Sequence, residues 1–117
     1  MSFRTMLFAV AAVAATIGIA HGPAVAGDQT VTIDNFTFNP AQISVKAGTT
    51  VTWTNQDDIP HTVTSTTRAF KSKAMDTDDK FSFTFTTPGT YEYFCSLHPH
   101  MTATVVVEAA TGSNTKP

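Results

Sequence analysis

The sequence predicts an all-β domain of about seven or eight short strands, arranged as a sandwich or barrel. Runs of β-branched and aromatic residues alternate with polar residues at a period of two. Turn-forming residues separate these runs at short, regular spacings. After the N-terminal region, no segment has the pattern of an amphipathic helix. The length of 117 residues is sufficient for one domain and too short for two.

The first 26 residues predict a signal peptide, which precedes this domain. Arg4 near the start is followed by an apolar run over residues 6–20 and by Ala24-Val25-Ala26. A positive start, an apolar run and an A-x-A site are typical of a cleaved secretory signal. The run is short for a membrane span, which needs about 20 residues, so a retained N-terminal anchor is the weaker alternative. We therefore expect export and a mature domain of residues 27–117.

Strand character recurs through the first half of the domain. Asp34-Asn35 predicts a bend, while Asn39-Pro40 and Ala47-Gly48 predict strand ends. A polar loop over residues 56–60 follows the most regular of these strands. The predicted strands are residues 31–33, 36–38, 42–46, 51–55 and 61–64.

The second half begins with an irregular segment, residues 65–79, which has no strand pattern. Pro88-Gly89 predicts a turn between two aromatic-rich runs. Residues 109–117 predict a frayed polar tail. The predicted strands here are residues 81–86, 91–95 and 102–108.

The period of the strands predicts which side chains enter the core, because alternate residues share a face. Val51, Trp53 and Asn55 share one face, so we expect Asn55 to be buried with the other two. A buried amide needs hydrogen-bond partners, and we expect Asn55 to bond a neighbouring loop. Tyr93 and Cys95 likewise share a face, which directs the thiol inward at the end of its strand.

The charges exclude a nucleic-acid-binding surface. Seven Lys and Arg against nine Asp and Glu give a net charge of −2, and no basic stripe is present. One acidic group has lysines close to it in the sequence, so we interpret it as part of a solvated loop. It consists of Asp76, Asp78 and Asp79, near Lys71, Lys73 and Lys80.

The single Cys, Cys95, is the start of the most informative segment, residues 95–101 (Cys-Ser-Leu-His-Pro-His-Met). In an exported chain an odd Cys forms an intermolecular bridge, stays free or binds a metal, and an exposed free thiol is prone to oxidation. His98 and Met101 follow at intervals of three, and His61 lies upstream after Pro60. Two His and one Cys in a trigonal plane, with a long axial Met, describe a blue-copper electron-transfer site.

We therefore predict one copper ion, cycling between Cu(I) and Cu(II), with His61, Cys95, His98 and Met101 as its ligands. His100 is the alternative to His98, but His98 lies evenly between Cys95 and Met101, so we expect His100 to face solvent. Met75 is a less favoured axial ligand. Zinc also accepts Cys and His, but it is a poor match for Met.

The surroundings of the predicted site suggest further roles. We expect Asn55, Pro60 and Pro99 to surround the ligands, with Asn55 joining the His61 loop to the Cys95 loop. Apolar residues around the turn would leave one edge of the His98 ring exposed as the electron port. The predicted docking residues for transient partners are Ile59, Leu97, Pro99 and His100. No general base, nucleophile or open metal position is evident, so we expect no enzyme activity.

These residues resemble the cupredoxin family, most of all its amicyanin group and more distantly its pseudoazurin and plastocyanin groups. The resemblance covers nearly the whole mature chain, and the Cys-x2-His-x2-Met spacing matches the short amicyanin loop. It is densest over residues 53–61, 83–85 and 89–101.

The resemblance implies a Greek-key β-sandwich, a type 1 copper site and one-electron transfer in the periplasm between redox proteins of the dehydrogenase or cytochrome c kind. It implies a monomer without stable membrane association. Amicyanins have an aromatic residue in place of His100, so the docking surface differs, and the resemblance alone does not imply their partner, methylamine dehydrogenase. A copper-handling protein, which delivers or buffers the ion, is the alternative function.

Overall fold

The computed structural model describes residue 24 and residues 27–110, so most of the predicted signal peptide and C-terminal tail lie outside the described residues. The described part of the chain is built from strands and loops without a helix, and it therefore holds no helix that could cross a membrane. The eight strands are β1 (Gln29–Asp34), β2 (Thr37–Asn39), β3 (Gln42–Lys46), β4 (Thr49–Asn55), β5 (Thr64–Ser65), β6 (Lys80–Phe85), β7 (Gly89–Cys95) and β8 (His98–Glu108).

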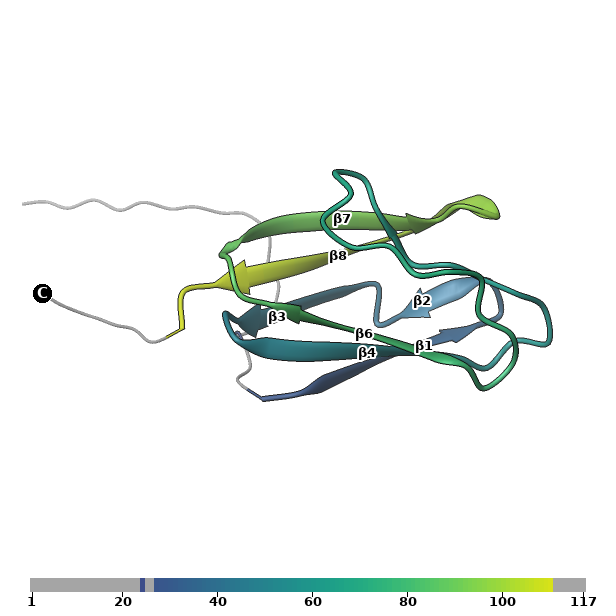
Figure 1. Cartoon of the computed structure of the whole chain (residues 1–117), viewed down its shortest axis with the longest axis horizontal. Coiled ribbons are helices and arrows are strands. Elements are labelled where there is room, and N and C mark those ends of the chain that lie inside the picture. Colours follow the sequence, from purple (N-terminus) through teal and green to yellow (C-terminus); the bar gives the residue numbers. More distant parts are fainter. Residues whose placement is uncertain (1–23, 25–26, 111–117) are drawn as a thin grey trace, which may run out of the picture.

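The strands form two four-stranded sheets that face each other (Figure 1). One sheet has the order β2-β1-β4-β6, and the other has the order β3-β8-β7-β5. Both sheets are mixed, because β1 runs parallel to β4 and β3 runs parallel to β8. The predicted β-sandwich is confirmed.

The core lies between the sheets and follows the predicted parity. Val51, Trp53 and Asn55 are fully buried on β4, and Tyr93 and Cys95 are buried on β7. Inward-facing side chains of two sheets make the core of a sandwich about 10 Å thick. The parity therefore delivers both an amide and a thiol to the interior at the ends of their strands.

The segment after the β4 loop differs from the prediction. We expected a strand over residues 61–64, but only Thr64 and Ser65 pair with β7. His61 instead forms an isolated bridge with Met75, through bonds of 3.2 and 2.8 Å between their backbones. All residues from His61 to Ser65 are buried, because the irregular segment 65–79 folds back over them. Burial on both faces removes the alternation that marks a half-exposed strand.

Strand β8 starts earlier than predicted, at His98 instead of Thr102. Three connections reach the same end of the sandwich: the β1–β2 turn, the loop from β4 to β5 and the β7–β8 turn (Figure 1). Residues that are far apart in the sequence therefore meet at this end.

Candidate metal centre

The β7–β8 connection is a tight turn that places Cys95 opposite His98. The two residues pair across the turn, with Ser96 and Leu97 between them. The next pair is Phe94 with Thr102, so residues 99–101 have no counterpart on β7 and form a bulge in β8. Bulges redirect side chains and are common next to functional sites. The bulge accommodates the predicted ligand segment without breaking the sheet behind it.

The donor atoms of His61, Cys95 and His98 converge, as the sequence predicted. Cys95 Sγ lies 3.7 Å from Nδ1 of His61 and 3.6 Å from Nδ1 of His98. One donor atom from each residue lies within 4.8 Å of the other two. His61 and Cys95 are fully buried, whereas His98 is half-buried. A thiol facing two imidazole nitrogens is the soft donor set that copper prefers, so these residues fit that metal.

The remaining sulfur and imidazole groups occupy distinct places. Met101 is buried on β8 and shares its inward face with Ala103 and Val105. Met75 is also buried and is the backbone partner of His61. His100 is exposed in the bulge, in agreement with the expectation that it faces solvent. The structure brings three of the predicted ligand groups together. The fourth, Met101, is buried on β8 three residues after His98.

Thr62 joins the His61 segment to the Cys95 turn. Its backbone N–H donates to Cys95 Sγ at 3.3 Å, and its hydroxyl oxygen accepts a 2.7 Å bond from the backbone N–H of Ser96. The sequence predicts Asn55 in this connecting role. The side-chain amide of Asn55 instead donates to the carbonyl oxygens of Ile59 and Met75, at 3.0 and 2.8 Å. The burial predicted for Asn55 and its contact with the His61 loop, at Ile59, are confirmed, but its second contact is Met75 and not the Cys95 loop.

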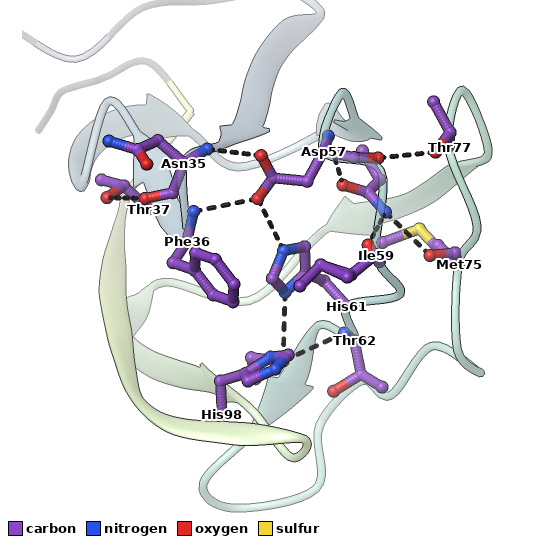
Figure 2. A network of polar contacts seen from close by, with 12 residues as sticks. Asn35, Phe36, Thr37, Asp57, Ile59, His61, Thr62, Met75, Thr77 and His98 are labelled. Atoms are coloured by element: carbon purple, nitrogen blue, oxygen red, sulfur yellow. Dashed lines mark hydrogen bonds and ion pairs between the residues drawn. The ribbon is translucent and has the colours of Figure 1, made fainter.

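Asp57 contacts the far side of the His61 ring. Its Oδ2 lies 2.7 Å from His61 Nε2 (Figure 2). The same carboxylate accepts backbone bonds of 2.6 Å from Asn35 and 2.9 Å from Phe36. Burial raises the pKa of Asp57, but the bonds from Phe36, Asn35 and His61 together outweigh it and leave the pKa below its ordinary value. An ionised Asp57 therefore favours a proton on Nε2 of His61 and leaves Nδ1 for a metal.

Phe36 lies beside both imidazole rings (Figure 2). Its ring centroid is 5.3 Å from that of His61 and 5.0 Å from that of His98, and both contacts are edge-on. Nearly half of Phe36 is exposed, so one side of its ring covers the histidines and the other meets solvent. Sequence reasoning missed Asp57 and Phe36. The available signals were an acid four residues before His61 and an apolar residue at a predicted bend.

The predicted docking residues lie at the surface to different degrees. Leu97 is half exposed, and Pro99 and His100 are exposed with it around the β7–β8 turn. Ile59 is half-buried, and Pro60, predicted to lie around the ligands, is exposed. The half-buried His98 is therefore flanked at the surface by exposed residues of the same turn, both apolar and polar.

Comparison with known proteins agrees with this geometry. A family model described as a cupredoxin-like domain matches residues 6–107. Amicyanin-alpha of Methylorubrum extorquens is 35% identical over 118 aligned positions, and the match covers 90% of this chain and 99% of that protein. Amicyanin of Paracoccus denitrificans is 39% identical over 83 aligned positions, and the match covers 67% of this chain and 63% of that protein. A solved amicyanin variant in its Cu(I) form superposes with a TM-score of 0.66 at 36% identity, covering 69% of this chain and 82% of the other. The chain therefore belongs to the cupredoxin family and is similar to its amicyanins.

Proposed function

We propose that this protein is a one-electron carrier with a type 1 copper site. The proposed ligands are His61, Cys95, His98 and Met101. The observation that carries the proposal is the convergence of two imidazole nitrogens on one buried thiol, within 4.8 Å of one another. The similarity to an amicyanin solved in its Cu(I) form supports copper as the metal.

A bound copper ion would supply a one-electron couple between Cu(I) and Cu(II). The protein supplies a rigid and largely dry site for it. His61 and Cys95 are closed to solvent, and Thr62 fixes the thiol turn against the His61 segment. Donors held by several separate strands and loops rearrange little, which lowers the cost of moving one electron. The half-buried His98 provides the proposed contact between the metal and an electron partner.

The proposed location is the periplasm, and the proposed partners are redox proteins of the dehydrogenase or cytochrome c kind. Ile59, Leu97, Pro99 and His100 would form the docking surface around His98. Electron-transfer encounters use small interfaces, below about 1,200 Å² in total, so a few residues around His98 would be sufficient for docking. Four ligands from the protein would leave no open metal position for a substrate. We therefore propose an electron carrier and no catalytic activity at the metal.

Addition of Cu(II) to the metal-free protein tests this function. We expect an intense blue absorption from sulfur-to-copper charge transfer, which Cys95→Ser abolishes. His98→Ala should also remove the blue absorption, whereas the matched variant His100→Ala should keep it. A blue Cys95→Ser protein would refute the site.

Electron exchange separates the carrier from the copper-handling alternative. A carrier should keep its copper in the presence of a competing chelator and should be reduced and reoxidised rapidly. Ready loss of copper together with slow redox cycling would favour delivery or buffering of the ion.

A further inference from the structure

We propose that Asp57 is a positioning residue that couples the β1–β2 turn to the proposed copper ligands. The four residues Asn35, Phe36, Asp57 and His61 are called the Asp57 network below. In this network one carboxylate sets the orientation of the His61 ring and also holds Phe36 against both imidazoles. This inference rests on the proposed function for its effect on copper, but its structural part concerns the metal-free protein.

The first argument is that three donors converge on the two oxygens of Asp57. Oδ1 accepts from the backbone of Asn35 at 2.6 Å, and Oδ2 accepts from the backbone of Phe36 at 2.9 Å and contacts His61 Nε2 at 2.7 Å. An ionised carboxylate can accept all three bonds, whereas an amide has only one accepting oxygen. An Asn at position 57 would therefore leave at least one of the three donors facing an NH2 group. The position requires a carboxylate.

The second argument is that Asp57 is itself held from the opposite side. Its backbone N–H donates to Oδ1 of Asn55 at 3.0 Å, and its carbonyl oxygen accepts a 2.7 Å bond from the hydroxyl of Thr77. Asn55 is in turn fixed by its bonds to Ile59 and Met75. The carboxylate is thus attached to a fixed backbone, and it can restrain the groups that bond to it. Asn55 supports the proposed metal site through Asp57.

The third argument comes from the backbone of the β1–β2 turn. Asn35 and Phe36 have φ angles of 55° and 58°, in the left-handed region. Asn tolerates this region better than most residues other than glycine, but it is unfavourable for a bulky residue such as Phe. Such a conformation persists where the surroundings impose it. The two backbone N–H groups of this turn are the groups that Asp57 binds, so the carboxylate stabilises the conformation that places Phe36.

The consequence of that conformation is the contact of Phe36 with both histidines. Its ring meets His61 at an angle of 87° and His98 at 88°, with centroids 5.3 and 5.0 Å away. The rings of His61 and His98 also contact each other, with centroids 4.9 Å apart. Asp57 therefore restrains His61 directly and restrains His98 through Phe36. Both imidazoles are oriented before a metal binds, which raises affinity by reducing the cost of ordering the ligands.

Metal-free protein provides the decisive experiment, with Asp57→Asn and Phe36→Ala as the test variants and Asp58→Asn as the matched control. Asp58 is an exposed neighbour that also carries a carboxylate. Nitrogen NMR of the imidazoles at mildly alkaline pH should show a proton on Nε2 of His61 in the wild-type and control proteins. Asp57→Asn should reduce the population of that tautomer, and it should speed exchange of the Asn35 and Phe36 amide protons.

The NMR signals of the His98 ring test whether Asp57 acts beyond its own contacts. They would not change if Asp57 affected only His61 and the turn. Phe36→Ala should shift them, because the ring current of Phe36 is lost. Asp57→Asn should shift them in the same direction, since it releases the turn that holds Phe36. The proposal would be overturned if Asp57→Asn and Asp58→Asn gave the same signals. The comparison covers the signals of His61, of His98 and of the two turn amides. If Asp57→Asn does not fold, Phe36→Ala still decides whether Phe36 lies against His98, and unchanged His98 signals would refute that contact.

Copper binding then links the network to the proposed function. Loss of such an outer partner lowers metal affinity by about 10- to 100-fold, so Asp57→Asn should bind Cu(I) that much more weakly in competition with a chelator. Asp58→Asn should bind like the wild type. A wild-type protein that never turns blue would contradict the proposed function, while the NMR measurements would still decide the Asp57 network. A blue wild type with equal affinity in Asp57→Asn would contradict only the effect of the network on copper.

Discussion

The indole nitrogen of Trp53 donates a 3.0 Å hydrogen bond to the phenol oxygen of Tyr93, and this bond joins the two sheets at the centre of the core. Trp53 lies on β4 of one sheet and Tyr93 on β7 of the other. Both side chains are buried. Burial raises the pKa of Tyr93 well above its ordinary value, and the bond from Trp53 offsets this only in part. The phenol stays neutral and supports the strand that ends at Cys95.

Removal of the phenol oxygen should therefore destabilise the fold. Tyr93→Phe leaves the indole N–H buried without its acceptor, which should lower the free energy of unfolding by about 1–3 kcal/mol. Urea unfolding of the metal-free protein measures this loss. Tyr91→Phe is the matched control, because its hydroxyl bonds the carbonyl of Thr87 near the surface. We expect the control to lose less than about 1 kcal/mol, and equal losses would contradict a special role for the buried bond.

The hydroxyl of Thr62 should help to hold the His61 segment against the Cys95 turn. Thr62→Val keeps the shape of the side chain but removes the acceptor for the backbone N–H of Ser96. We expect a loss of about 1–3 kcal/mol in the free energy of unfolding and faster amide exchange at Ser96. The blue absorption of the copper-loaded protein should also shift, because the Cys95 turn is less constrained.

Thr52→Val is the control for this experiment. The Thr52 hydroxyl pairs with that of Ser82 across two strands at the exposed side of the sheet, at 2.6 Å. Cross-strand pairs of this kind contribute about 0.2–1 kcal/mol. A Thr62→Val protein as stable as Thr52→Val, with unchanged exchange at Ser96, would show that the link between the segments is dispensable.

The alternation of apolar and polar residues along the strands predicted most of the fold. The residue types and spacing of the proposed ligands predicted the converging donors. Alternation predicted the burial of Asn55, Tyr93 and Cys95, because a strand has only two faces. The interval of three from Cys95 to His98 placed both predicted ligands in one short segment, and the two residues pair across the β7–β8 turn. Strand parity and the Cys95–His98 spacing depend on local sequence, whereas the approach of His61, 34 residues from Cys95, was inferred from the donor types that copper binds.

The features that were missed depend on contacts between distant loops. The predicted strand at residues 61–64 is mostly a buried segment, covered by residues whose conformation has no simple period. The bonds from Asn35 and Phe36 to Asp57 require the β1–β2 turn to arrive beside the loop that follows β4. That turn depends on left-handed backbone angles at Asn35 and Phe36; Asn often adopts such angles, but Phe does not, so the second angle could not be predicted from residue type.

Copper should stabilise the folded protein, because a preformed site exists only in the native state. At a free metal concentration about 1,000 times the dissociation constant, binding adds about 4 kcal/mol to the free energy of unfolding. Thermal unfolding of the wild type should therefore shift to a higher midpoint on metal addition. Cys95→Ser should show little shift, since it lacks the thiolate. An equal shift in both proteins would indicate that copper binds elsewhere on the chain.

The axial position is tested by a matched pair of buried methionines, Met101 and Met75. Both are nearly closed to solvent, and Met→Leu in a core usually costs less than about 1.5 kcal/mol. The axial ligand tunes the potential of a blue-copper site. Loss of a thioether donor weakens Cu(II) more than Cu(I), so Met101→Leu should raise the reduction potential while the blue colour persists. Met75→Leu should leave the potential unchanged. A shift in Met75→Leu, with none in Met101→Leu, would move the axial role to the residue that pairs with the His61 backbone.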